Sequence, residues 1–278
     1  MAKLRFVGFL FLVNFASCLY INTTSNGTET ENASEESEAN GEEIGGNFQG
    51  DMILSPSQIY SLFSMSRNGL IDERYRWPKN SDGIVEVAYK FEVGDFTLSE
   101  KETIRKAMDE IESVSCIKFV HSDDALMKIY DGMGCASAVG MQTDRQYVSL
   151  NSQYCIKSGK IIHELLHALG FYHMQNAYDR DDYIKINFDN IEKGFESNFA
   201  RYRNSEVSYF DTGYDYGSVM HYSPYGFSKN GLKTIEPIKE AKDSDKAQQM
   251  GQREGMSDGD VKRLNNMYQC SSKINQNE

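Results

Sequence analysis

The hydrophobic and polar positions of the first part of the chain predict β-strands. Apolar and polar side chains alternate over residues 84–91, a pattern typical of a strand with one buried face. Residues 126–130 predict a second, shorter strand. Residues 214–225 are rich in glycine and tyrosine and show no regular period, so they are expected to form a loop.

Helical spacing of apolar residues dominates the later part of the chain. Ser99 followed by Glu102 is the pattern of a capping box and predicts the start of a helix. One face of this helix would carry four apolar residues, namely Ile104, Met108, Ile111 and Val114. Residues 189–202 and 258–268 predict two further amphipathic helices. Because strands come early and helices late, the pattern indicates an α+β protein.

Composition narrows the class of protein. The chain has 278 residues, of which 40% are hydrophobic and 25% charged, as in a globular protein. Its 29 basic and 41 acidic residues give a net charge of −12, which argues against a nucleic-acid partner. Globular composition runs from residue 68 to residue 270, without repeats, so a single domain of about 200 residues, in one or two lobes, is expected there.

Residues 1–18 have the layout of a secretory signal peptide. Lys3 and Arg5 precede an apolar stretch over residues 6–15, and Ala16 and Cys18 supply the small residues of a cleavage site. The alternative is a buried N-terminal helix. We therefore expect removal of residues 1–18 and a secreted, extracellular protein.

Cleavage after Cys18 would leave an even number of cysteines. The four that remain are Cys116, Cys135, Cys155 and Cys270. In an exported chain this number implies two disulfides, for which three pairings are possible.

Residues 19–45 are polar and too poor in large apolar side chains to form a core. They contain three acceptor triplets for N-glycosylation, at Asn22, Asn26 and Asn32. Residues 19–67 carry eight acidic residues and one basic residue. This part of the chain is interpreted as a flexible, acidic, glycosylated appendage.

The segment 163–173 carries the chemistry. On a helix, His163 and His167 lie one turn apart and direct both imidazoles from one face. Glu164 lies beside them, where a carboxylate can hold water without binding the metal. Gly170 can end the helix in a left-handed conformation, after which His173 can return as a third ligand. Three ligands leave a fourth position for water, the arrangement of a catalytic zinc site.

With this motif the sequence resembles the astacin-type zinc endopeptidases, a branch of the metzincins, over nearly all of residues 48–270. Residues 218–222 (Ser-Val-Met-His-Tyr) resemble the Met-turn of that family. The resemblance implies that Met220 lies beneath the zinc site and that Tyr222 approaches the metal, although Tyr222 could also be a simply buried tyrosine. It also implies a first lobe with a twisted, mostly parallel sheet and two long helices, and a largely irregular second lobe with a terminal helix.

Further matches extend this resemblance. Residues 135–140 resemble an edge strand above the cleft, where a peptide can add as another strand. Residues 148–159, 226–231 and 251–253 and the last helix also match. By the same resemblance the disulfides are Cys116–Cys270 and Cys135–Cys155.

The acidic appendage then resembles a propeptide. Residues 48–51 (Phe-Gln-Gly-Asp) are similar to the aspartate switch, in which the carboxylate of Asp51 replaces water on zinc. Alignment on Trp77 places the activation cleavage between Arg67 and Asn68, with Arg74 and Arg76 as weaker alternatives. We thus expect a propeptide over residues 19–67 and a catalytic domain over residues 68–278.

Two positions depart from the family pattern. After the third histidine the family usually has glutamate, and three residues later arginine, whereas this chain has Met174 and Ala177. That glutamate ordinarily meets the new amino terminus of the processed enzyme. We expect altered anchoring of Asn68 but intact catalysis, because the ligands and Glu164 are present.

The resemblance implies hydrolysis of peptide bonds in proteins, with one zinc ion per chain. Glu164 would act as general base, and Tyr222 would donate to the developing oxyanion. We further expect a zymogen activated by a trypsin-like protease, a monomer, and no membrane anchor. The competing hypotheses are a catalytically silent binding module with the same cleft, and a structural zinc protein.

Overall fold

The computed structural model describes residues 41–44, 46–63, 73–143, 146–204, 207–238 and 245–271. They belong to one unit of the chain, Ala39–Glu278. The expected signal peptide, the acceptors Asn22, Asn26 and Asn32, and the Arg67–Asn68 bond lie outside the described residues. The predictions for these positions therefore stay predictions.

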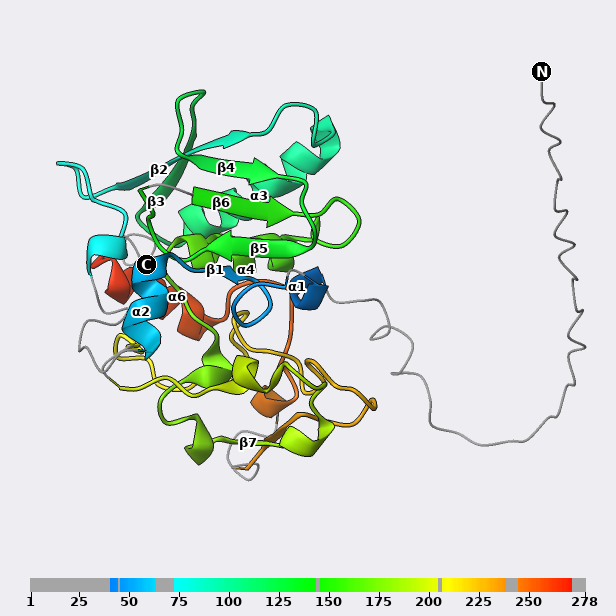
Figure 1. Ribbon diagram of the computed structural model, residues 1–278. Helices are drawn as coiled ribbons and strands as arrows, with labels where there is room; N and C mark the ends of the chain where they lie inside the picture. The colour runs from blue at the N-terminus through cyan, green and yellow to red at the C-terminus, as the bar shows by residue number, and fades with distance from the viewer. Residues whose placement is uncertain are drawn as a thin grey trace, which may run out of the picture. The chain divides into compact units, whose positions relative to one another are not determined.

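A six-stranded sheet forms the first lobe, in the order β1-β5-β6-β4-β2-β3 (Figure 1). Its strands are β1 (Met52–Ile53), β2 (Val85–Phe91), β3 (Ile117–His121), β4 (Met127–Tyr130), β5 (Cys135–Ala138) and β6 (Gln146–Leu150). All neighbours are parallel except β5 and β6, which are antiparallel. The mostly parallel sheet is confirmed, as are the predicted strands at β2 and β4.

Helix α3 (Leu98–Ser113) begins two residues earlier than predicted. Its N-cap is Thr97, whose hydroxyl accepts the Glu100 N–H at 3.3 Å while Glu100 Oε2 accepts the Thr97 N–H at 2.7 Å. The prediction that Ser99 and Glu102 form the capping box was wrong. Phe96 is buried against Phe91, with ring centroids 5.8 Å apart, and this anchor fixes where the chain enters the helix.

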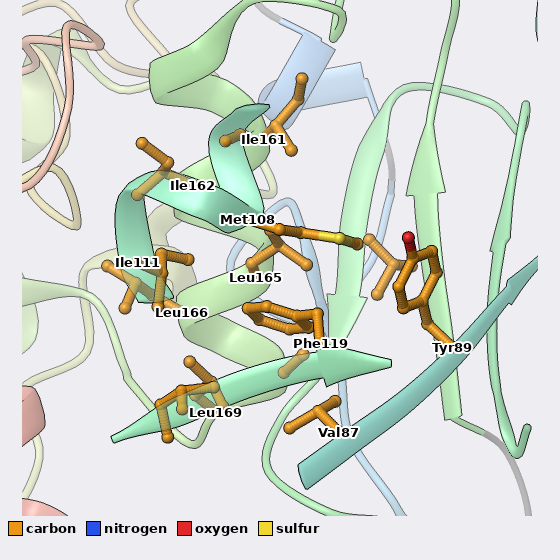
Figure 2. Close-up of a cluster of buried hydrophobic side chains, with 14 of the residues drawn as sticks. Val87, Tyr89, Met108, Ile111, Phe119, Ile161, Ile162, Leu165, Leu166 and Leu169 are labelled. Carbon is orange, nitrogen blue, oxygen red and sulfur yellow. The ribbon is translucent and has the colours of Figure 1, made fainter. Parts of the chain in front are cut away.

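Helix α4 (Ser158–Ala168) packs beside α3, and both cover one face of the sheet. The core lies between these layers (Figure 2). Ile104, Met108 and Ile111 of α3, which the helical period identified, are fully buried. Val114 lies just beyond the helix as its C-cap.

The second lobe is mostly irregular, as expected. It contains a two-stranded sheet, β7 (Ile184–Ile186) with β8 (Ile235–Pro237), and ends in helix α6 (Asp258–Met267). Residues 214–225 form turns without regular structure, and the terminal helix matches its prediction.

The predicted helix over residues 189–202 is wrong. Two short 3-10 turns, Phe188–Asn190 and Glu196–Phe199, replace it. Gly194 between them has a φ of 100°, which breaks the helical path. The backbone of Ile191 forms a β-bridge with Ser228, and the Glu192 N–H donates to the Phe227 carbonyl. Backbone groups of this segment are therefore bonded to a distant part of the chain instead of to the next turn of a helix.

The described N-terminal residues form α1 (Gly41–Ile44), β1 and α2 (Pro56–Phe63). Strand β1 pairs with β5 in parallel, so it occupies the side of β5 where the resemblance predicted that a peptide can add. The structure joins Cys116 to Cys270 and Cys135 to Cys155, the pairing that the resemblance implied. Among the described residues, no helix has the length and apolar character needed to span a bilayer.

Candidate metal centre

Helix α4 positions the first two histidines of the site. His163 and His167 lie one turn apart, are fully buried, and bring their Nε2 atoms to 3.1 Å from each other. Gly170 ends the helix with a φ of 103°, and its N–H donates to the His167 carbonyl at 2.8 Å. The chain then reverses and brings His173 Nε2 to 3.4 Å from His163 Nε2. The structure thus shows the predicted end of the helix at Gly170 and the predicted return of His173 toward the other two histidines.

The second ring nitrogen of each histidine faces an acceptor oxygen. His163 Nδ1 lies 2.8 Å from the Val219 carbonyl, and His167 Nδ1 lies 2.8 Å from the Phe171 carbonyl. His173 Nδ1 lies 3.1 Å from a side-chain oxygen of Gln49. A carbonyl oxygen can only accept, so each Nδ1 carries the hydrogen and each Nε2 presents a lone pair.

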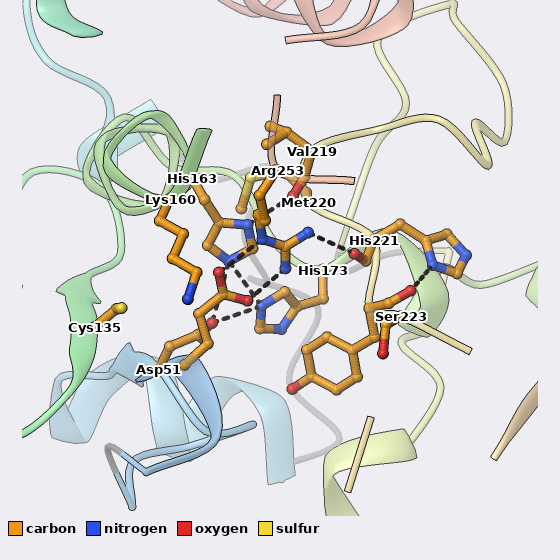
Figure 3. A network of polar contacts seen from close by, with 12 residues as sticks. Asp51, Cys135, Lys160, His163, His173, Val219, Met220, His221, Ser223 and Arg253 are labelled. Atoms are coloured by element: carbon orange, nitrogen blue, oxygen red, sulfur yellow. Dashed lines mark hydrogen bonds and ion pairs between the residues drawn. The ribbon is translucent and has the colours of Figure 1, made fainter. Parts of the chain in front are cut away.

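A carboxylate joins these three lone pairs. Asp51 Oδ2 lies 3.1 Å from His163 Nε2 and 3.2 Å from His173 Nε2 (Figure 3). Its Oδ1 lies 3.5 Å from His167 Nε2. All four ligand atoms lie within 4.8 Å of one another, and all four side chains are buried. Electron pairs that converge without a hydrogen between them repel one another unless a cation lies among them. Three imidazoles and one carboxylate are ligands that Zn²⁺ takes in a tetrahedral site.

Glu164 lies beside this centre without belonging to it. Its carboxylate is fully buried, and neither oxygen has a hydrogen-bond partner among the described residues. Burial, and then the nearby charge of Asp51, raise the pKa of Glu164 well above its usual range. A carboxylate held this way is poised to take a proton.

The Met-turn closes the site from the second lobe. Met220 is fully buried and its carbonyl accepts the Met174 N–H at 3.0 Å, next to the third ligand. The ring of Tyr222 lies 4.6 Å from that of His173, and its hydroxyl donates to the Gln49 carbonyl. Burial raises the pKa of Tyr222 well above its usual range, so the hydroxyl keeps its proton as a donor.

Sequence reasoning missed an ion pair at the edge of the site. Arg253 donates from Nε and Nη2 to the two carboxylate oxygens of Glu42, at 2.7 and 2.5 Å. Its Nη1 donates to the His221 carbonyl at 3.0 Å (Figure 3). Arg253 stood in a matched motif but had no assigned role, and Glu42 was one acid among many in an acidic segment. No sequence signal could have joined residues 211 positions apart.

Met174 and Ala177 lie where the family pattern has charged residues. Both are almost fully buried and line a cavity of about 50 Å³ together with Tyr172, Phe210 and Met267. The described lining of this cavity includes no carboxylate. An ammonium group entering it would therefore find no acidic partner in that lining.

A buried three-histidine centre on a His-Glu-x-x-His helix, with a free glutamate and a Met-turn, defines a zinc peptidase. The family model described as Astacin, a peptidase family, matches residues 70–269. The chain therefore belongs to the astacin family of zinc metalloendopeptidases.

Individual relatives agree with this assignment. The chain is 41% identical over 224 residues to the low choriolytic enzyme of Oryzias latipes, covering 80% of this chain and 78% of that protein. It is 36% identical over 242 residues to seminal metalloprotease 1 of Drosophila melanogaster, covering 83% and 90%. The solved structure of high choriolytic enzyme 1, a hatching enzyme zinc-protease from Oryzias latipes, matches with a TM-score of 0.66 and 35% identity. That match covers 72% of this chain and 96% of that one.

Proposed function

We propose that this chain is the secreted, latent precursor of an astacin-family endopeptidase that hydrolyses peptide bonds in proteins. The observation that carries the proposal is the carboxylate of Asp51 at the convergence point of the three histidine Nε2 atoms. In this proposal residues 19–67 are a propeptide, called the pro-segment below, and residues 68–278 are the catalytic domain. Cleavage between Arg67 and Asn68 by a trypsin-like protease removes the pro-segment.

Within the proposed site each residue has a separate task. His163, His167 and His173 would hold a zinc ion, which supplies Lewis acidity to the water and to the substrate carbonyl. Glu164 takes the proton from the attacking water and later delivers it to the leaving nitrogen. The Tyr222 hydroxyl donates to the oxygen of the scissile carbonyl as negative charge develops on it.

Latency follows from the same contacts. Asp51 takes the position that the water needs, and the Gln49 carbonyl accepts the hydroxyl proton of Tyr222. Strand β1 pairs with β5, along the side where a substrate would add as a strand. The pro-segment thus blocks the nucleophile, the oxyanion donor and the substrate strand together.

Secretion is supported by the leader-like residues 1–18 and by the two disulfides, which persist in oxidising compartments. Glycans on Asn22, Asn26 and Asn32 would keep the pro-segment soluble. We further propose that the enzyme acts as a monomer.

The test compares cleavage of an unstructured protein before and after limited trypsin treatment. We expect activity only after treatment for the wild type, and measurable activity without treatment for Asp51→Ala. Equal latency of Asp51→Ala and wild type would contradict the aspartate switch.

Glu164→Gln is the matched control for the catalytic assignment. Because Glu164 is not a ligand, the variant should retain zinc after trypsin treatment. Its kcat should fall by about 10³-fold or more, since general bases contribute roughly 10²–10⁴-fold. Substantial residual proteolysis would remove Glu164 as the base.

A further inference from the structure

Gln49 occupies a costly position in the pro-segment. Its side chain is 1% exposed, and its backbone has a φ of 50°, a left-handed conformation that is unfavourable for a non-glycine residue. Its Nε2 has no hydrogen-bond partner among the described residues. A half-satisfied buried amide lowers stability, so packing alone does not account for this residue.

The oxygen of the Gln49 side-chain amide, in contrast, accepts two hydrogen bonds. This Oε1 accepts from the Tyr202 hydroxyl at 2.7 Å and from His173 Nδ1 at 3.1 Å. A tyrosine hydroxyl can also accept, so it does not decide the orientation of the amide. His173 Nε2 faces the metal centre, which leaves the hydrogen on Nδ1, and a donating Nδ1–H needs the oxygen of Gln49 at this end. The Gln49 side chain therefore contacts a metal ligand from the outside, two residues before Asp51 reaches the centre itself.

This contact distinguishes His173 from the other two ligands. The outer nitrogens of His163 and His167 donate to the backbone carbonyls of Val219 and Phe171, which belong to the catalytic domain. The outer nitrogen of His173 donates to a pro-segment side chain. Such outer partners fix the tautomer and orientation of a ligating histidine. His173 therefore loses its acceptor when the pro-segment leaves.

We propose that Gln49 is a removable positioning residue for the zinc ligand His173. The pro-segment then strengthens metal binding in the precursor through two residues, Asp51 as a fourth ligand and Gln49 as the group that orients the third. The inference rests on the proposed function, because it takes the pro-segment to be the part that is removed. It assigns the precursor a role in acquiring and retaining its metal.

The test measures the zinc affinity of the full-length chain by competition with a chromogenic chelator. Gln49→Met keeps the length of the side chain and removes the acceptor. We expect about a tenfold loss of affinity, the lower end of the range for losing an outer partner. Gln49→Glu restores an acceptor and should recover most of the affinity.

A second glutamine of the described N-terminal segment provides the matched control. Gln58 is equally buried, and its Nε2 donates to the Val139 carbonyl at 2.9 Å, away from the metal ligands. Gln58→Met should loosen the docking of the segment to a similar degree but change zinc affinity by less than about twofold. An equal loss in both variants would show that Gln49 acts only by docking the segment, and would overturn the proposal.

A spectroscopic measurement separates orientation from simple loss of structure. In the zinc-loaded, full-length chain, NMR should detect a hydrogen-bonded Nδ1–H on each ligating histidine. Gln49→Met should shift or broaden the His173 signal and leave the His163 and His167 signals in place. Unchanged affinity with an unchanged His173 signal would refute the inference while leaving the proposed peptidase intact. Failure of the wild type to bind zinc would instead refute the proposed function.

Discussion

The two lobes that form the metal site are stabilised in different ways. In the first lobe, apolar side chains with regular spacing pack between two helices and a sheet. One of these helices, α4, carries His163, Glu164 and His167. The second lobe supplies His173 and Tyr222. It has a smaller apolar cluster, and buried polar side chains hold its irregular backbone by hydrogen bonds. The site therefore combines a ligand pair set by helix geometry with a third ligand held in place by individual hydrogen bonds.

Two buried polar residues illustrate the second lobe. Arg180 Nη1 donates to the carbonyls of Phe199 and Gln175. Gln175 follows His173 by two positions. Asp260, in the first turn of α6, accepts from the Ser218 hydroxyl at 2.6 Å and the Val219 N–H at 2.8 Å. These side chains fix the segments that carry the third ligand and the Met-turn.

The largest expected effects are on the free energy of unfolding of the processed enzyme, and they come from one substitution in each lobe. Ile111→Ala removes a fully buried core side chain of α3 and should lower the free energy of unfolding by about 2–5 kcal/mol. Arg180→Met leaves buried carbonyls unpaired and should cost about 3 kcal/mol. Urea unfolding measures both.

Only the second substitution should also reduce kcat under conditions where both variants remain folded, because Arg180 supports the His173 segment. An equal kcat for the two variants would contradict the proposed division between the lobes.

Tyr222→Phe sharpens the role of the second lobe at the reaction centre. Loss of the hydroxyl should lower kcat of the processed enzyme by about 10²-fold, with little change in KM or zinc content, because the donor acts on charge that develops during reaction. Steady-state kinetics measure the split. The control is Tyr214→Phe, whose hydroxyl contacts His221 at 2.7 Å, and this variant should stay much closer to the wild type. A rise in KM alone for Tyr222→Phe would assign the residue to binding.

The smallest effect concerns the ion pair that joins the pro-segment to the second lobe. Burial and the nearby charge of Asp51 oppose ionisation of Glu42, but the charge and hydrogen bonds of the Arg253 guanidinium lower the pKa of Glu42 from 4.5 to about 2. A lowered carboxyl pKa stabilises the folded state above pH 4.5, and this stabilisation is lost as pH falls toward 2.

Glu42→Gln tests this pH dependence in the full-length chain. At pH 7 the variant should be less stable than the wild type by about 2 kcal/mol, the scale of a hydrogen bond to a charged group. The difference should shrink below pH 4.5, as thermal or urea unfolding at several pH values would show. A constant difference from pH 7 to pH 3 would contradict the assigned ionisation of Glu42.

The contrast between the lobes also explains what the sequence could reveal. The ligands were predictable because a four-residue spacing on a helix fixes both rings, and Gly170 marks the helix end. The start of α3 was misplaced because Thr97 with Glu100 and Ser99 with Glu102 fit the same pattern, and only the burial of Phe96 decides between them.

The helix wrongly predicted over residues 189–202 lies in the second lobe. There the spacing of apolar residues reflects the packing of turns, and Gly194 interrupts the helical period. Gln49 and the pair of Glu42 with Arg253 lay beyond sequence reasoning for a different reason. Their contacts join positions far apart in the chain, and no local period encodes them.

X-ray absorption at the zinc edge, combined with metal analysis of the full-length and trypsin-processed chain, examines the three-histidine site without relying on activity. We expect one zinc ion per chain in both forms, bound by three imidazole nitrogens at about 2.0–2.1 Å. The oxygen ligand should come from Asp51 in the full-length form and be replaced by solvent after processing, so Asp51→Ala should alter only the first spectrum. Fewer than three imidazoles, or a spectrum of the full-length chain that Asp51→Ala leaves unchanged, would contradict the metal site described above.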